Sequence, residues 1–276
     1  MAKLNILSKH EKFKRHGDKI GFHCVVFVVE QAGIFYTGSL SDRSMTPDNV
    51  AQLDDLQKIE TKDRGPKLQD HWTIARPSGC HYVKKPKLED YLDPELEARM
   101  TLEIEVWELI RRRPHEGLAV YHGCVVADGR VSGLCFERYE QTLMQRVNPK
   151  ALSKPDFTRS DRSLVQNDIK QCLQTIREAL EHLHSIGFSH NDLNPSNIMM
   201  GKDNRAVIID MDSSCRIGES LEKKKRTYGW LDEHVNYSTF DNDLKALDEV
   251  ETWLFGTAIA RAAATSIDSA QIQATV

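Results

Sequence analysis

The fold is decided by the stretch His190-Asn191-Asp192-Leu193-Asn194-Pro195-Ser196-Asn197. The apolar run Ala206-Val207-Ile208-Ile209 follows it, and Asp210 comes directly after that run. Such a run of apolar and β-branched residues predicts a short strand. The sequence therefore predicts that Asp192, Asn197 and Asp210 lie on the two sides of a short hairpin.

These three side chains carry the functional groups of phosphoryl transfer. An Asn and an Asp brought together can hold Mg²⁺ through their oxygen atoms. A second Asp close by can receive the proton of an attacking hydroxyl. Phosphoryl transfer needs little else except positioning and charge neutralisation. An Asp two residues after a His is common by chance, but the whole string between an amphipathic helix and a strand indicates a catalytic loop of the kinase type.

Length and charge narrow the class of protein. The 276 residues suit one large domain or two lobes that share a cleft. The formal net charge is −4, so no global basic field favours a nucleic-acid partner. The longest strongly apolar run, residues 24–29, is far too short to span a bilayer. We therefore expect neither a nucleic-acid nor a membrane partner, and the oligomeric state stays open.

The six cysteines fit buried positions better than a metal site. They are Cys24, Cys80, Cys124, Cys135, Cys172 and Cys215. They form no Cys-x-x-Cys pair and no spacing that couples them to His, and most sit in apolar segments, where a free thiol packs as a small hydrophobe. Residues 1–17 also lack an apolar signal core. These features predict a reducing compartment, so we expect an intracellular protein of the cytoplasm or the nucleus.

The first half of the chain is predicted to be rich in strands. In order, we expect strands at 24–29 and 34–37 forming a hairpin, a short helix at 47–59, a polar connector at 60–69, strands at 71–75 and 80–83, a helix at 94–113, and a hairpin of 118–126 with 131–136.

The second half is predicted to be mainly helical. Residues 148–163 form a Pro/Ser/Asp-rich loop, and a helix follows that should end near Gly187. The apolar residues of that helix recur with helical spacing at Ile169, Cys172, Leu173, Ile176, Ala179, Leu180 and Leu183. A further helix is marked by Leu244, Leu247, Val250 and Leu254.

Five strings resemble the protein kinase-like superfamily. They are Tyr82-Val83-Lys84-Lys85-Pro86, residues 114–124, residues 133–139, the loop from His190 onward, and Arg226-Thr227-Tyr228-Gly229-Trp230. More narrowly, the chain is similar to divergent kinase-like proteins abundant in filamentous fungi. The resemblance covers residues 70 to 256.

This resemblance implies a two-lobed α+β kinase-like fold with a β-rich N-lobe and a shortened helical C-lobe. The expected domains are an N-terminal extension at 1–69 with a β-hairpin and a short helix, and a kinase-like domain at 70–256 followed by a tail at 257–276. Within that domain, residues 70–139 form the N-lobe and residues 140–256 form the C-lobe.

The resemblance also implies roles for individual residues. Asp192 is the catalytic base that accepts the proton of the substrate hydroxyl. His190 packs in the core and braces the loop, while Asn197 binds Mg²⁺ and orients the base. Asp210 stands at the position of the metal-binding Asp of the Asp-Phe-Gly motif. Asp243 resembles the Asp that hydrogen-bonds the backbone of the catalytic loop.

The family also places a phosphate-anchoring Lys at the end of an N-lobe strand. Lys84 is the first choice because it follows the apolar Val83. Lys85 is the alternative, since strand alternation sends one of the two side chains into the cleft and the other to solvent. An ion pair with a Glu on the next helix would hold the ammonium where it can bridge the α- and β-phosphates of ATP.

Glu103 is the expected partner of that Lys. Apolar residues follow Glu103 at +3, +4 and +7, namely Val106, Trp107 and Ile110. This spacing places Glu103 beside the apolar face that docks on the sheet, whereas Glu105 and Glu108 are less well placed. The resemblance further implies that Phe136 lies near the gatekeeper position, and that Glu137 to Tyr139 form the hinge that offers backbone groups to adenine.

Several positions depart from the family pattern. The chain has no Gly-x-Gly-x-x-Gly, so the phosphate lid is degraded. Asn191 replaces the usual Arg, which argues against activation by a phosphorylated loop residue docking there. Asn194 replaces a Lys that neutralises the γ-phosphate in Ser/Thr kinases, and Asp212 replaces the Gly of Asp-Phe-Gly. Little sequence is left for the substrate-binding helices that usually end the C-lobe.

Three functions therefore compete. The favoured one is an ATP- and Mg²⁺-dependent kinase that phosphorylates Ser or Thr of an unknown protein. A pseudokinase that only binds nucleotide fits the missing Gly-rich loop and the short C-lobe. A small-molecule phosphotransferase of the aminoglycoside or choline kinase type fits Asn191, Asn194 and Asp212.

Overall fold

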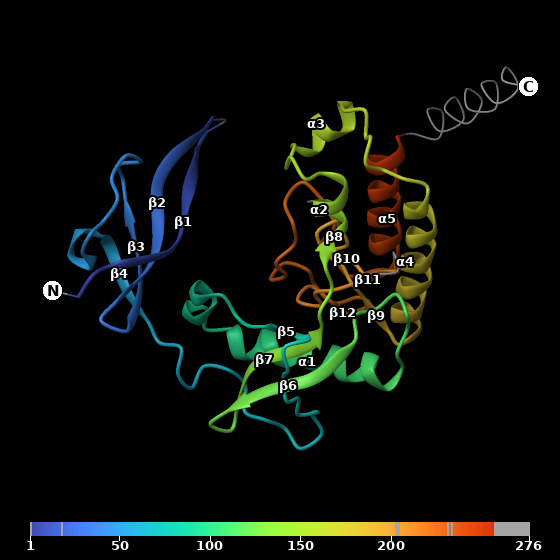
Figure 1. Cartoon of the computed structure of the whole chain (residues 1–276), viewed down its shortest axis with the longest axis horizontal. Coiled ribbons are helices and arrows are strands. Elements are labelled where there is room, and N and C mark those ends of the chain that lie inside the picture. Colours follow the sequence, from blue (N-terminus) through green and yellow to red (C-terminus); the bar gives the residue numbers. More distant parts are fainter. Residues whose placement is uncertain (1, 18, 202–204, 231, 233, 257–276) are drawn as a thin grey trace, which may run out of the picture. The chain divides into compact units, whose positions relative to one another are not determined.

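A computed structural model describes residues 2–17, 19–201, 205–230, 232 and 234–256 (Figure 1). Strands dominate the first half and helices the second, so the predicted α+β class is confirmed. The chain divides into two compact units. The first comprises Met1–Asp70, Lys84–Thr101 and Val125–Gly133, and the second comprises His71–Val83, Leu102–Cys124 and Leu134–Val276. The domain and lobe boundaries given above stay predictions, and the tail at 257–276 lies outside the described residues.

The first unit contains a four-stranded antiparallel sheet in the order β1-β2-β3-β4 (Figure 1). Its strands are β1 (Asn5–His16), β2 (Lys19–Gln31), β3 (Ile34–Leu40) and β4 (Asp54–Ile59). The predicted hairpin is confirmed as β2–β3, joined by Ala32 and Gly33, whose φ angles of 54° and 77° suit a tight hairpin turn. Alternate residues of β2 build one core face, with Val25, Phe27 and Val29 all buried.

Two predictions for the N-terminal segment were wrong. Residues 47–59 do not form a helix, because a single 3₁₀ turn, η1 (Val50–Gln52), is followed by β4, which pairs with β3. Leu53, Leu56 and Ile59 have helical spacing, but pairing with the neighbouring strand outweighs that weak periodicity. The strand β1 was missed because it is an edge strand whose residues are mostly polar and exposed, as such strands commonly are.

The next segments mostly follow the predictions. The expected helix is α1 (Leu96–Arg112), preceded by the 3₁₀ turn η2 (Leu88–Leu92). The strands β5 (His81–Lys84), β6 (Tyr121–Ala127) and β7 (Arg130–Glu137) form a sheet in the order β5-β7-β6. Residues 71–75 were predicted to be a strand, but only Ile74 forms a bridge there, to Cys124.

The second unit carries most of the helices. They are α2 (Leu143–Val147), α3 (Lys154–Arg159), α4 (Asp168–Ser185) and α5 (Phe240–Phe255). All seven apolar residues predicted for α4 are buried, so its periodicity was a sound guide. The short helix α3 was missed inside a predicted loop, although Ser153 caps its start and Pro155 lies in its first turn.

Short strands lie on both sides of the stretch 190–197 and position its ends. They are β8 (Gln141–Thr142), β9 (Phe188–Ser189), β10 (Ile198–Met200), β11 (Ala206–Ile208) and β12 (Cys215–Arg216). Gly187 follows α4 with a φ of 89°, a conformation that turns the chain into β9 and strains other residues. Because β10 pairs antiparallel with β11, Asn197 and Asp210 come to the same end of a hairpin.

Two further observations concern the cysteines and the helices. All six cysteines are free, and five of them are buried, Cys80 being the exposed one. Within the described residues, no helix has the length and apolar character needed to cross a membrane.

Candidate active site

The loop between β9 and β10 is braced from inside by His190. This side chain is fully buried, and its Nδ1 atom accepts a hydrogen bond from the Asp192 backbone N–H at 3.2 Å. Its Nε2 atom therefore carries the proton and donates to the Ile209 carbonyl oxygen at 2.9 Å. One imidazole thus links the loop to the residue before Asp210, which confirms the predicted bracing contact.

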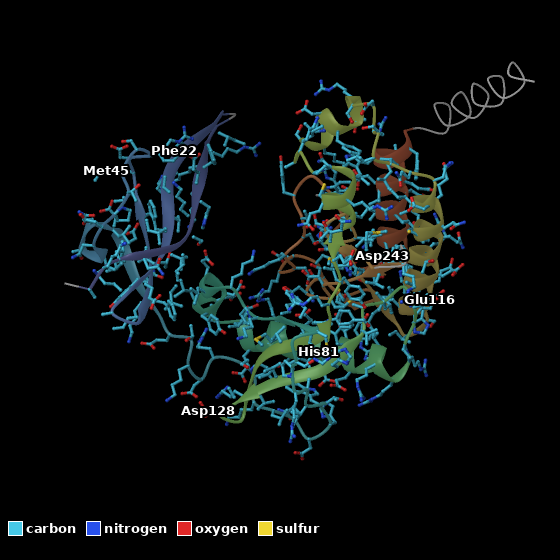
Figure 2. The ribbon with its side chains drawn as sticks, in the orientation of Figure 1. Phe22, Met45, His81, Glu116, Asp128 and Asp243 are labelled. Atoms are coloured by element: carbon cyan, nitrogen blue, oxygen red, sulfur yellow. The ribbon has the colours of Figure 1, made fainter. Side chains whose placement is uncertain are left out.

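Asp243 of α5 fixes the backbone of the same loop. Its carboxylate accepts hydrogen bonds from the N–H groups of His190 at 2.8 Å and Asn191 at 2.7 Å. It also lies 2.8 Å from Nε2 of His184, near the end of α4. The side chain is fully buried and lies within the second unit (Figure 2). The predicted contact between Asp243 and the loop backbone is therefore confirmed.

Asn191 ties the loop to its surroundings through neutral hydrogen bonds. Its Nδ2 atom donates to the Ser189 carbonyl and to Oγ of Ser238, each at 3.1 Å. Its Oδ1 atom accepts from Nδ2 of Asn242 in α5, also at 3.1 Å. The residue is 8% exposed and has a φ of 63°, in the left-handed region that Asn tolerates better than most residues.

Asp192 points to the open side of the loop and is held there by Asn197. The Nδ2 atom of Asn197 donates to the Asp192 carbonyl oxygen at 2.9 Å and to its Oδ2 atom at 3.1 Å. Both side chains are half-buried. Because the nitrogen of the Asn197 amide is used by Asp192, the oxygen of that amide is its remaining group for a further ligand.

Thr227 binds the Asp192 carboxylate through both of its donors. Its backbone N–H donates to Oδ1 at 2.7 Å, and its hydroxyl donates to Oδ2 at 2.9 Å. Asn194, fully buried, donates from Nδ2 to the Thr227 hydroxyl at 3.1 Å and to the Asp192 carbonyl at 2.9 Å. The sequence placed Thr227 in a family-like string but gave no sign of this contact.

Burial raises the pKa of Asp192 above its ordinary value. The hydrogen bonds that Asp192 accepts from the N–H and the hydroxyl of Thr227 oppose that shift, and the negative charge of Asp210 adds to it. A carboxylate with a raised pKa is a better proton acceptor, as a general base requires.

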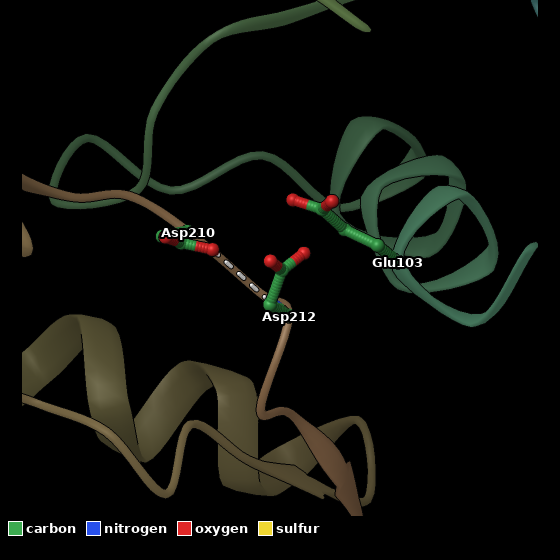
Figure 3. A group of neighbouring side chains, drawn as sticks. All are labelled: Glu103, Asp210 and Asp212. Carbon is green, nitrogen blue, oxygen red and sulfur yellow. Dashed lines mark hydrogen bonds between the residues drawn. The ribbon is translucent and has the colours of Figure 1, made fainter. Parts of the chain in front are cut away.

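Three carboxylates converge beside this loop (Figure 3). Oxygen atoms of Glu103, Asp210 and Asp212 lie within 4.8 Å of one another, and among the described residues this is the one group of three such side chains at that spacing. Glu103 is buried, and the other two are half-buried. Asp210 has a φ of 66°, and its Oδ1 atom accepts the Asp212 backbone N–H at 3.3 Å. Asp212 was predicted only as a replaced Gly, so its place in the cluster was missed.

Two other acidic residues of α1, Glu105 and Glu108, are engaged elsewhere. Glu105 accepts hydrogen bonds from His71 and from the indole N–H of Trp72, each at 2.8 Å. Glu108 accepts from the backbone N–H of Thr73 at 2.7 Å and from its hydroxyl at 3.0 Å. Glu103 is thus the Glu of α1 whose carboxylate lies beside Asp210, a neighbour that its helical spacing did not predict.

The structure does not test the predicted ion pair between Glu103 and Lys84 or Lys85. Lys84 is the last residue of β5 and belongs to the first unit, as does Lys85, whereas Glu103 belongs to the second unit. The pairing of either Lys with Glu103 stays a prediction.

The predicted hinge is anchored to the residue before β6. Phe136 is buried, and its ring packs 4.9 Å from Trp107, between centroids. The backbone N–H of Glu137 donates to the Val120 carbonyl at 3.0 Å, and the Tyr139 hydroxyl accepts the Val120 N–H at 3.1 Å. These contacts fix the segment, while its role in binding adenine stays a prediction.

Residues 73–258 match the protein kinase domain family. The chain belongs to that family. The matched part of this kinase domain includes the catalytic loop, the acidic cluster and α5, and it excludes the sheet β1–β4.

Segments of this chain are similar in sequence to individual kinases. The probable serine/threonine-protein kinase FPV226 of fowlpox virus is 27% identical over 147 residues, which is 50% of this chain and 45% of that protein. The putative ribosomal protein S6 kinase alpha-1 of Caenorhabditis elegans is 34% identical over 76 residues, 27% of this chain and 9% of that protein. The serine/threonine-protein kinase cds1 of Schizosaccharomyces pombe is 33% identical over 105 residues, 37% of this chain and 23% of that protein. The chain thus spans less than half the length of these relatives.

Proposed function

We propose that this kinase domain is an ATP- and Mg²⁺-dependent protein kinase that transfers the γ-phosphoryl group to a Ser or Thr hydroxyl. The observation that carries this proposal is the contact between Asp192 and Thr227. The carboxylate already accepts a hydrogen bond from an alcohol, at 2.9 Å, on the same loop hairpin as Asn197 and Asp210. A substrate hydroxyl bound in that way is oriented for attack and can lose its proton to Asp192.

Each neighbour of Asp192 has a definite part in this proposal. Asn197 holds the carboxylate in place through Nδ2. Asp243 holds the backbone just before Asp192 and His190 accepts a hydrogen bond from the Asp192 N–H, so little reorganisation is needed when the hydroxyl binds. The acceptor proton passes to a carboxylate oxygen of Asp192 as the hydroxyl oxygen bonds to the γ-phosphorus and the ADP oxygen leaves.

The side chains around Asp210 suit Mg²⁺. Asn197 would offer an amide oxygen and Asp210 a carboxylate oxygen, and both are hard donors of the kind that Mg²⁺ prefers. Asp212 and Glu103 add carboxylates within 4.8 Å of Asp210. The ion would neutralise charge on the phosphate oxygens. Lys84 or Lys85, paired with Glu103, would contact the phosphates, and residues from Phe136 to Tyr139 would bind adenine.

A transfer assay with labelled ATP tests the proposal. The purified chain is incubated with Mg²⁺ and ATP, alone, with generic protein acceptors, or with aminoglycosides, and Asp192→Asn is run beside it. Transfer to protein Ser or Thr that the substitution removes is the expected result. Transfer to aminoglycosides alone would favour a small-molecule phosphotransferase. ATP binding without any transfer would favour a pseudokinase, with Asn194 and the missing Gly-rich loop as the leading physical causes.

Metal dependence has a readout that needs no turnover. ATP should raise the melting temperature in the presence of Mg²⁺ and have little effect with EDTA, because a ligand that binds only the folded state stabilises it, by an amount that grows with the logarithm of its concentration relative to its Kd. Equal stabilisation in both conditions would argue for metal-free nucleotide binding.

We further propose that the protein works inside the cell. Five of its six free thiols are buried, which suits a reducing compartment. Cell fractionation with a compartment marker tests this, and recovery of the protein from the secreted fraction would contradict it.

A further inference from the structure

Four consecutive basic residues, Lys223-Lys224-Lys225-Arg226, come immediately before Thr227. In sequence alone such a short run is typical of a solvated surface. Its surroundings in the fold change that interpretation. Because Thr227 binds Asp192 through its N–H and its hydroxyl, the basic run 223–226 ends beside the proposed catalytic base.

The basic run is held in place and does not hang free. Two residues before the run, Leu221 is buried, and its N–H donates to the Asn236 carbonyl at 2.9 Å. In its middle, the Ser213 hydroxyl donates to the Lys225 carbonyl at 2.6 Å, and Nζ of Lys224 donates to the Ser214 carbonyl at 3.0 Å. These bonds connect the run to the segment just after Asp210, so the backbone at Lys225 and the ammonium of Lys224 have defined positions there.

The charges around the acceptor position are otherwise unfavourable for an acidic substrate. Asp192, Asp210 and Asp212 bring carboxylates to this region, and Asn194 is a neutral residue where the resemblance expects a Lys. The basic run 223–226 therefore supplies positive charge on the Thr227 side of the base. Lys223 and Lys225 have exposed side chains, so their charges lie at the surface of the protein.

We propose that the substrates of this kinase carry acidic residues next to the phosphorylated Ser or Thr, and that the basic run 223–226 binds them. The inference rests on the proposed function and names the substrate class of the same site. A peptide that presents its hydroxyl to Asp192 must pass the residues that flank Thr227. Opposite charges there attract and orient the peptide, and a basic peptide would be repelled.

Two synthetic peptides with one Ser test this. They differ only at the flanking positions, which are Asp and Glu in one peptide and the isosteric Asn and Gln in the other. Each exposed ion pair changes affinity by up to about fivefold, so we expect kcat/KM to favour the acidic peptide on the order of tenfold. The difference should lie in KM, and it should shrink at high salt because salt screens exposed charges.

Charge-reversed variants locate the effect. In Lys223→Glu/Lys225→Glu the preference should vanish or invert, and in Lys223→Gln/Lys225→Gln it should decrease. The matched control is Lys12→Glu/Lys14→Glu, which changes the net charge equally at two exposed lysines of β1, outside the matched kinase residues. That control should keep the full preference. Circular dichroism of each variant checks that it is folded.

The outcomes separate this inference from the proposed function. Equal kcat/KM for both peptides would overturn the acidic-substrate inference and leave the kinase function intact. If neither peptide is phosphorylated, the kinase proposal fails, and fluorescence anisotropy with labelled peptides then decides the inference. Tighter binding of the acidic peptide that is lost in Lys223→Glu/Lys225→Glu supports it, and equal affinity overturns it. Displacement of the acidic peptide by a much lower concentration of single-stranded oligonucleotide would also overturn it, in favour of a nucleic-acid partner.

Discussion

The two sides of the catalytic loop are built from different kinds of contact. On the buried side, His190, Asn191 and Asp243 are at most 8% exposed, and their polar atoms bind other groups of the second unit. On the open side, Asp192 and Asn197 are half-buried and hydrogen-bonded to each other. In the proposed function the Asn197 amide oxygen binds Mg²⁺, and the Asp192 carboxylate binds the substrate hydroxyl.

This difference predicts that the buried side of the loop determines the stability of the fold and that the open side determines catalysis. Buried polar groups that are fully hydrogen-bonded fix a backbone, and removing one partner leaves the others unsatisfied at a large cost. Groups on the open side contribute less to the fold, because water or a ligand can replace a lost partner. Substitutions on the buried side should therefore change the melting temperature, and those on the open side should change turnover or ligand binding.

The largest effect is expected for Asp192→Asn on the open side. General-base catalysis contributes about 10²- to 10⁴-fold, so kcat should fall by on the order of a hundredfold or more. Nucleotide affinity should stay within about twofold, because the lost group acts mainly in the transition state. Asp241→Asn, on the exposed face of α5 with 74% of its side chain accessible, is the matched control. Wild-type turnover in Asp192→Asn would show that the loop is not catalytic as proposed.

Asp243→Asn should give the largest effect on the buried side. The substitution turns one acceptor oxygen into an N–H₂ group that faces the donors of His190, Asn191 or His184. A loss of about 3 kcal/mol in the free energy of unfolding is expected when one partner of a buried charged network is removed. For a domain of this size that corresponds to about 6–12 °C in melting temperature. Thermal denaturation beside Asp241→Asn measures it, and a change equal to that control would remove the distinction between the two sides.

Two substitutions of Asn191 separate the stability that its hydrogen bonds contribute from the cost of its left-handed backbone conformation. Asn191→Ala removes the side-chain bonds to Ser189, Ser238 and Asn242 and puts Ala at a φ of 63°. Asn191→Gly removes the same bonds but relieves the strain. We expect losses of about 2 kcal/mol for Ala and about 1 kcal/mol less for Gly. Denaturant titration of both variants gives the difference, and equal values would mean that the left-handed conformation costs nothing here.

Asp210→Asn should weaken the binding of Mg-ATP without unfolding the protein. It replaces a charged ligand by a neutral one on the open side, and we expect affinity to fall on the order of tenfold. Asp212→Asn tests whether the third carboxylate shares that role, because its oxygens lie within 4.8 Å of those of Asp210. Isothermal titration with a non-hydrolysable ATP analogue gives both affinities. If Asp212→Asn binds like wild type while Asp210→Asn does not, the metal site is the two-residue set that the sequence predicted.

The sequence revealed the loop and α4 because their signals are local. Helical spacing of apolar residues predicted all the residues that α4 buries, and the resemblance implied the contact of Asp243 with the loop backbone. The contact of Thr227 with Asp192 joins residues that are 35 positions apart, and no periodicity encodes it. The place of Asp212 in the acidic cluster was missed for a similar reason, because its distance from Glu103 depends on how α1 packs.

Errors in secondary structure had a related cause. The segment that became β4 has an apolar residue at every third position, which suits a helix, but pairing with β3 determined its conformation. The strand β1 carries mostly polar residues, so its apolar signal is weak, and pairing with β2 defines it. Local propensity was therefore reliable where one element buries its own apolar face, and unreliable where a neighbouring strand supplies the bonds.

The smallest expected effect is the pH dependence that Asp192, on the open side, gives to the stability of the fold. Burial raises the pKa of Asp192 above its ordinary 3.8, so at neutral pH the ionised carboxylate is less favourable in the folded state than in the unfolded state. Between the two pKa values the folded state binds more protons than the unfolded state. Lowering the pH through the raised folded pKa therefore stabilises the fold, and the gain is complete below the unfolded pKa.

Asp192→Asn isolates this contribution, since Asn resembles the protonated carboxyl and does not titrate. In nucleotide-free protein with EDTA, the melting temperature of Asp192→Asn minus that of wild type should decrease as the pH is lowered from 7 to 4, because wild type gains stability and the variant lacks that gain. Taking the difference cancels the titration of all other groups that the two proteins share. A difference that stays constant, or that grows on acidification, would contradict the raised pKa and would mean that the bonds from Thr227 outweigh burial.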